Sequence, residues 1–87
     1  MIKAFTDDAW DDYCFWVMQD KKTLKRIHLL LKDIERNGNT GIGKPEPLKN
    51  DKQGYWSRRI DDCNRVVYKI ENDVLKIVQC GSHYRDH

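Results

Sequence analysis

The chain has 87 residues, which suit a single domain over residues 1–87 with a modest core and exclude a phosphate-loop nucleotide hydrolase built on a large parallel sheet. No apolar run approaches the roughly 20 residues that span a bilayer, and the first residues lack a secretory signal, so we expect a soluble cytoplasmic protein. The formal net charge is +2, but residues 1–20 carry one Lys against five Asp, whereas residues 21–87 carry 15 basic and nine acidic side chains, which favours a phosphate-bearing partner for the later part.

The N-terminal part predicts a short strand followed by a helix. Ile2 to Phe5 is a short β segment, and Thr6 can cap a helix whose first turn carries Asp7 and Asp8, both favourable at the positive end of the helix dipole. The apolar side chains that recur at helical spacing, and so predict the buried stripe of this helix, are Trp10, Tyr13, Cys14 and Val17.

A second helix is expected after Asp20. The side chains predicted to form its buried face are Leu24, Ile27, Leu31 and Ile34. The basic side chains predicted to lie largely outside are Lys22, Lys25, Lys32 and Arg36. The helix should end at Asn37-Gly38, because Gly after a basic last turn commonly terminates a helix.

The next segment, residues 38–53, predicts an irregular loop. Its sequence "GNTGIGKPEPLK" matches the start of the nucleotide-binding pattern G-x-x-x-x-G-K-[ST], but Pro45 replaces the Ser or Thr that binds Mg²⁺. The segment also follows a helix, whereas a phosphate loop follows a strand and opens a helix. We therefore expect no nucleoside triphosphate to bind here.

One carboxylate in this loop has an unusual setting. Pro45 and Pro47 bracket Glu46, and the two rings hold it on an extended and rather stiff backbone. Lys44 and Lys49 flank it. A carboxylate among lysines can act as a proton acceptor, although a solvated surface position is the ordinary role of such a residue.

Three strands are expected in the last part of the chain, at residues 55–60, 65–70 and 74–80, and Asn72 and Asp73 suit a tight turn between the last two. The order β-α-α-β-β-β predicts an α+β fold with a helical hairpin packed on a mostly antiparallel sheet.

Alternation along the strands separates two faces. Val66, Tyr68 and Ile70 should face the core, which turns Arg65 toward solvent or a cleft. Arg59 should share a face with Ser57, opposite Arg58. Taken alone, Arg65 is an ordinary surface arginine of a sheet.

The cysteines and histidines give a weak metal signal. Three cysteines without a framework pattern indicate reduced thiols. The side chains that could bind zinc are Cys63, Cys80, His83 and His87. They lack the close Cys pair of structural zinc sites, so we predict no metal site and no cofactor.

The motifs together resemble the YoeB or Txe family of bacterial toxins, within the wider RelE-like superfamily. The resemblance covers essentially the whole chain, with the motifs in order. They are "WDDY" (10–13), "GKPEPLK" (43–49), "GYWSRRI" (54–60), "RVVY" (65–68) and "HY" (83–84).

The resemblance implies a compact microbial-ribonuclease-like fold and the toxin of a type II toxin-antitoxin system, a ribosome-dependent mRNA endoribonuclease. The partners it implies are a YefM-like antitoxin, the ribosome and mRNA, with a homodimer as one state open to it. In the family pattern Glu46 is the general base, Arg65 the phosphate clamp and His83 the general acid, with Tyr84 beside it. The cations expected to bind RNA phosphates are Lys44, Lys49 and Arg59.

The chemistry of RNA cleavage without metal agrees with these residue types. The 2′-OH must lose a proton, the phosphate must be stabilised as its negative charge grows, and the leaving 5′ oxygen must gain a proton. A carboxylate, a guanidinium and an imidazole supply this set. Two other classes stay open: an RNA- or ribosome-binding inhibitor of translation that does not cut, and a protein whose basic surface serves to bind an acidic partner.

Overall fold

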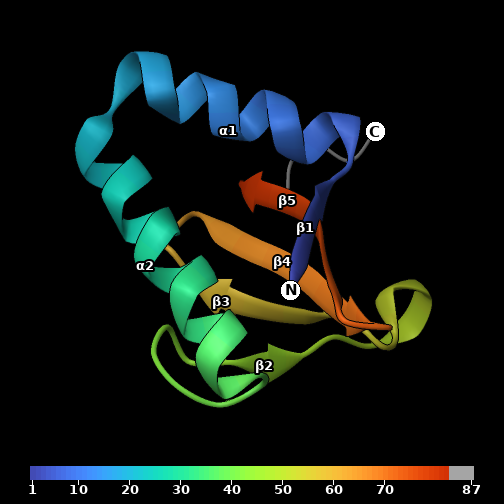
Figure 1. Ribbon diagram of the computed structural model, residues 1–87. Helices are drawn as coiled ribbons and strands as arrows, with labels where there is room; N and C mark the ends of the chain where they lie inside the picture. Colours follow the sequence, from blue (N-terminus) through green and yellow to red (C-terminus); the bar gives the residue numbers. More distant parts are fainter. Residues whose placement is uncertain (83–87) are drawn as a thin grey trace.

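The computed structural model describes residues 1–82 and places two helices on one side of a five-stranded sheet (Figure 1). The expected order of elements is confirmed, with two additions inside the segment expected to be an irregular loop: a two-residue strand and a turn of 3₁₀ helix. The elements are β1 (Ile2–Phe5), α1 (Asp7–Gln19), α2 (Lys21–Asn37), β2 (Glu46–Pro47), η1 (Asn50–Lys52), β3 (Trp56–Arg59), β4 (Arg65–Glu71) and β5 (Val74–Gly81).

The sheet has the strand order β1-β5-β4-β3-β2. The edge strand β1 runs parallel to β5, and every other neighbouring pair is antiparallel. An irregularity in the pairing of β4 with β5 falls between Val67 and Tyr68, whose partners are Gln79 and Ile77, so Val78 is the extra residue of a β-bulge. The turn from β4 to β5 is confirmed: Asn72 and Asp73 have φ of 52° and 61°.

Helix α1 begins as expected but buries a different face. The Thr6 side chain accepts a hydrogen bond from the Ala9 backbone N–H at 3.2 Å, which confirms the cap. The predicted buried stripe is wrong, since Trp10 is 51% exposed and Val17 is 40% exposed, while Tyr13 and Cys14 are half-buried. The buried residues are Ala9 and Asp12. The surface aromatic rings instead pack on one another, with Trp10 and Tyr13 stacked at 5.4 Å.

Helix α2 supplies most of the helical core. Asp20 caps its start by accepting hydrogen bonds from two backbone N–H groups, and Gly38 ends it with φ of 67°. The expected buried side chains are confirmed, except that Leu24 is half-buried and Leu30 joins them. The core that these helices build with the sheet comprises Ala9, Ile27, Leu30, Leu31, Ile34, Ile60, Val66, Tyr68, Leu75, Ile77 and Cys80.

No helix of residues 1–82 covers the sheet face opposite α1 and α2, which we call the open face, although Ser57 and Val67 on it are buried by their neighbours (Figure 1). Val66 and Tyr68 point into the core and are fully buried, as the alternation along β4 predicts. Arg65, Val67 and Lys69 therefore lie on the other face. Within residues 1–82, no helix is long and apolar enough to cross a membrane.

Candidate functional site

Glu46 lies at the start of the short edge strand β2 and is exposed. Its register partner is Ser57 of β3. The extended backbone that the two prolines predict is therefore confirmed, and pairing with the sheet fixes the direction of the side chain. Ser57 in turn pairs with Val67, and Val67 with Gln79, so Glu46 heads a row of residues across four strands.

The neighbouring row carries two arginines side by side. Arg59 of β3 and Arg65 of β4 are direct register partners, and Arg65 is followed across the sheet by Gly81. Like charges directly opposite each other destabilise a sheet, so this pair marks a place where a bound anion would be stabilising. Because Ser57 and Arg59 are two residues apart, this row lies about 7 Å from the row of Glu46.

The backbone near the arginines is held by local hydrogen bonds. Arg65 Nη1 donates to the Asp61 carbonyl at 3.1 Å, and the Asp61 side chain accepts from the backbone N–H groups of Cys63 and Asn64. Burial opposes ionisation of Asp61, but the hydrogen bond from the Asn64 side chain and those from the two backbone N–H groups hold its pKa below the ordinary value. The Arg59 N–H donates to the Gly43 carbonyl at 2.6 Å and so ties the loop that carries Glu46 to β3.

The structure thus brings three of the predicted site residues, Glu46, Arg59 and Arg65, to one open face of the sheet. Lys44 and Lys49 are exposed on the same loop, two and three residues from Glu46. His83 and Tyr84 lie outside the described residues. The sequence left open whether the faces of Arg59 and Arg65 meet that of Glu46, and the register of β2 on β3 answers that they do.

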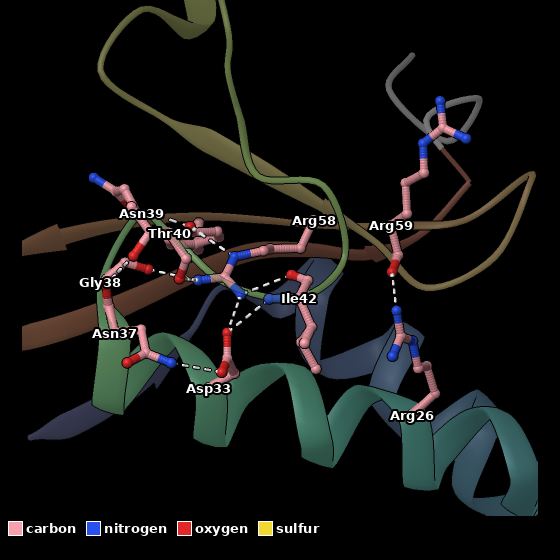
Figure 2. A network of polar contacts seen from close by, with 10 residues as sticks. Arg26, Asp33, Asn37, Gly38, Asn39, Thr40, Ile42, Arg58 and Arg59 are labelled. Atoms are coloured by element: carbon pink, nitrogen blue, oxygen red, sulfur yellow. Dashed lines mark hydrogen bonds and ion pairs between the residues drawn. The ribbon is translucent and has the colours of Figure 1, made fainter.

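The sequence reasoning gave no role to Arg58, but its side chain holds the loop segment at residues 38–42, which precedes Glu46 in the chain (Figure 2). Its side chain is fully buried and its guanidinium contacts the Asp33 carboxylate of α2 at 2.6 Å. The same group donates to the backbone carbonyls of three loop residues, at 2.6, 3.0 and 2.8 Å, namely Gly38, Thr40 and Ile42. One side chain therefore closes the whole turn between α2 and the loop.

The partners of Arg58 complete this network. Asp33 also accepts from the Ile42 N–H and from Asn37, and the hydrogen bond from Arg58 is the main reason that the pKa of Asp33 lies below its ordinary value. Arg58 Nε donates to the Tyr68 hydroxyl at 3.3 Å, and burial raises the pKa of Tyr68. The sequence did contain a signal for the burial of Arg58, because alternation along the strand places it on the same face as Ile60, a core side chain.

A second buried polar residue was also missed. Asp12 is 7% exposed, and its carboxylate accepts a hydrogen bond from the Cys80 backbone N–H at 3.0 Å. This contact ties α1 to the end of β5, together with the Trp16 indole, which donates to the Cys80 carbonyl. Burial, and secondarily the Asp12 charge, raises the pKa of Cys80 to about 12.

The residues weighed for zinc are distributed differently. Cys63 is exposed in the turn before β4, Cys80 is buried in the core, and His83 and His87 are outside the described residues. Over residues 1–82 the structure contains no group of three or more His, Cys, Asp or Glu side chains placed to hold a metal ion.

Comparison with known proteins places this architecture in one family. Residues 5–84 match the family model of the YoeB-like toxin of bacterial type II toxin-antitoxin system. The toxin YoeB of Streptomyces coelicolor is 55% identical over 81 residues, covering 93% of this chain and 96% of the relative.

Solved structures agree. YoeB in a heterotetrameric YoeB-YefM complex from Staphylococcus aureus has a TM-score of 0.91 and 45% identity, covering 97% of this chain and 98% of that one. A YoeB dimer from the same organism has a TM-score of 0.90 with the same identity and coverage. The chain therefore belongs to the family of YoeB-like toxins of bacterial type II toxin-antitoxin systems.

Proposed function

We propose that this toxin is an endoribonuclease that cuts mRNA on the translating ribosome, and so acts in the cytoplasm. The observation that carries the proposal is the register that sets Arg59 and Arg65 side by side next to Glu46 on an open sheet face. Beside these cations Glu46 would weaken a surface that only binds RNA, because a carboxylate repels the phosphates, whereas a cleaving enzyme needs a proton acceptor there.

In the proposed reaction Glu46 takes the proton of the 2′-OH, which then attacks the adjacent phosphorus. Arg65, helped by Arg59, stabilises the negative charge that grows on the phosphate oxygens, because a guanidinium offers paired donors and keeps its charge. The family pattern gives His83 the proton transfer to the leaving 5′ oxygen and places Tyr84 beside it. Lys44 and Lys49 are exposed where they can contact neighbouring phosphates.

The products follow from this attack. The P–O bond to the 5′ oxygen breaks, so the upstream fragment ends in a 2′,3′-cyclic phosphate and the downstream fragment begins with 5′-OH. The reaction uses the side chains and the RNA itself, without a metal ion.

The partners proposed are a YefM-like antitoxin, the ribosome and mRNA, and a second copy of the chain. The antitoxin and the second copy are proposed from the Staphylococcus aureus relative, whose structures contain a YoeB-YefM complex and a YoeB dimer. An antitoxin that covers the open sheet face would hold the enzyme inactive.

The test is cutting of a defined message during translation with purified ribosomes. Glu46→Gln should lower the rate by about 10²- to 10⁴-fold, the usual contribution of a positioned general base, while ribosome association stays near that of the parent. Asp51→Asn, at an exposed carboxylate of the same loop, is the matched control and should cut normally.

A message with one 2′-deoxy nucleotide at the mapped cut site separates the mechanisms. It should resist cutting there, because the nucleophile is missing. Cutting at the deoxy site, or downstream fragments with 5′-phosphate, would rule out attack by the 2′-OH. Normal inhibition of translation with intact messages would favour an inhibitor that binds without cutting.

A further inference from the structure

A second set of side chains lies on the open sheet face, on the other side of Glu46 from the two arginines. Lys69 follows Arg65 by four residues on the same face of β4, which places the two about 13 Å apart along the strand. Lys76 of β5 is the register partner of Lys69. Tyr55, which precedes β3, is part of this set, since the Lys69 ammonium lies 5.4 Å from the centroid of its ring.

The two lysines repeat the pattern of the arginine pair. Like charges directly opposite each other destabilise a sheet, and here nothing strong offsets the repulsion. Glu71 lies 3.6 Å from the Lys69 ammonium and 3.5 Å from that of Lys76, and the three side chains are 32–50% exposed. Exposed ion pairs at such distances contribute little. A phosphate between the lysines would remove the repulsion.

A hollow beside these lysines has room for a flat ring. Its volume is about 180 Å³, and it is lined by Tyr55 and Lys76 together with Ala4 and Val78. Lys69 contacts the Tyr55 ring but does not line the hollow. A planar base that enters the hollow would contact the Tyr55 side chain, with Lys76 beside it for its phosphate. Aromatic rings next to cations are the usual means of holding unstacked RNA bases.

We propose that Tyr55, Lys69 and Lys76 form a nucleotide subsite, which holds one nucleotide of single-stranded RNA a few positions from the bond that is cut. The base stacks on Tyr55, and the adjoining phosphate lies between the lysines in place of Glu71. The position relative to the cut rests on the proposed function, but the subsite itself can be tested without any cutting.

Binding is measured on the full chain carrying Glu46→Gln, which keeps the RNA intact. The probe is a short single-stranded RNA containing 2-aminopurine, whose fluorescence falls when the base stacks. Tyr55→Ala should weaken binding by about 5- to 150-fold, the range for loss of one stacked base, and abolish the fluorescence change. Tyr55→Phe keeps the ring and should retain both.

The lysines and Glu71 provide an opposite pair of effects. Lys76→Gln should weaken binding and reduce the slope of log K against log salt by about 0.7, the value for one phosphate contact on a single strand. Glu71→Gln should strengthen binding, because it removes a carboxylate that competes with the phosphate. Lys25→Gln, at an exposed lysine of α2, is the matched control and should change neither.

The outcomes support or overturn the nucleotide subsite as follows. Unchanged affinity and stacking in Tyr55→Ala, or a parent protein that shows no stacking signal, overturns the subsite even where wild-type protein cuts messages normally. Stacking that depends on Tyr55 supports it even where wild-type protein fails to cut, in which case only the proposed function falls. If Tyr55→Ala loses its fold by circular dichroism, Lys76→Gln and Glu71→Gln decide, and weaker binding in Glu71→Gln refutes the subsite.

Discussion

Replacing Arg58 by Met should destabilise the protein far more than the same change at its neighbour Arg59. Met retains much of the apolar stem of the side chain but removes the guanidinium. The Asp33 carboxylate then loses its contact at 2.6 Å, and the three loop carbonyls that Arg58 binds lose their donor. The side chain is fully buried, so water does not solvate the charge in the parent protein and its protein partners must do so.

The magnitude follows from this burial. Removing one partner of a buried ion pair costs about 3–5 kcal/mol. The loop carbonyls and Asp33 lie near the surface, where water can replace the lost donor, so we expect the lower end, about 3 kcal/mol. A chain of this size has a free energy of unfolding of roughly 4–13 kcal/mol, so the loss is a large part of the total.

The assay is urea unfolding followed by tryptophan fluorescence, in the Glu46→Gln background so that the toxin can be produced. With a slope of about 1–1.5 kcal/mol per M urea, Arg58→Met should lower the midpoint by about 2–3 M. Arg59→Met, on the exposed face of the same strand, should change the free energy of unfolding by no more than about 0.5 kcal/mol. Equal midpoints for the two variants would refute the argument that the buried network holds the fold together.

Three further measurements test the charges and thiols. Because Arg58 lowers the pKa of Asp33 from its ordinary value of 3.8, the ionised carboxylate stabilises the fold above that pH and loses its contribution as the pH falls through the lowered pKa. The urea midpoints of the parent and of Asp33→Asn should therefore stay apart at neutral pH and converge as the pH falls below 3.8; a constant difference would contradict the ion pair. The second measurement is alkylation of the native protein, followed by mass spectrometry. Exposed Cys63 should react readily, whereas Cys80 should react only after unfolding, because burial raises the pKa of Cys80 to about 12. Early labelling of Cys80 would contradict its burial. Arg65→Gln should reduce the salt slope of RNA binding by about 0.7, and an unchanged slope would mean that Arg65 contacts no phosphate.

Local chemistry made much of the fold predictable. The cap at Thr6, the start of a helix after Asp20, the glycine after α2 and the turn at Asn72 and Asp73 each depend on neighbours within a few residues, and all four are confirmed. The buried face of α1 was not predictable in this way. Periodicity assumes that large apolar side chains seek the core, but Trp10 packs on other aromatic rings at the surface instead.

The candidate site depended on pairing between distant segments. The residue types at Glu46, Arg59 and Arg65 were readable from the motifs, but their common face follows from the register of β2 on β3. The strand Glu46–Pro47 has two residues and so no periodicity to reveal this face. The role of Arg58 was hidden for a related reason. Its acceptors are mostly backbone carbonyls, which every sequence contains, so only the folded loop shows that they converge.

The two adjacent arginines of β3 show how the fold and the candidate site share one strand. Because successive side chains of a strand point to opposite faces, Arg58 enters the core and Arg59 faces the open side, as the different directions of the two side chains in Figure 2 show. The strand β2 pairs with β3 through two residues, and the Leu48 N–H extends this pairing by donating to the Tyr55 carbonyl at 2.9 Å. Arg58 anchors the loop at residues 38–42, and the Arg59 N–H holds it again at Gly43. The charge buried in the core therefore helps to place the Glu46 carboxylate on the opposite face of the sheet, next to the arginines with which it acts in the proposed reaction.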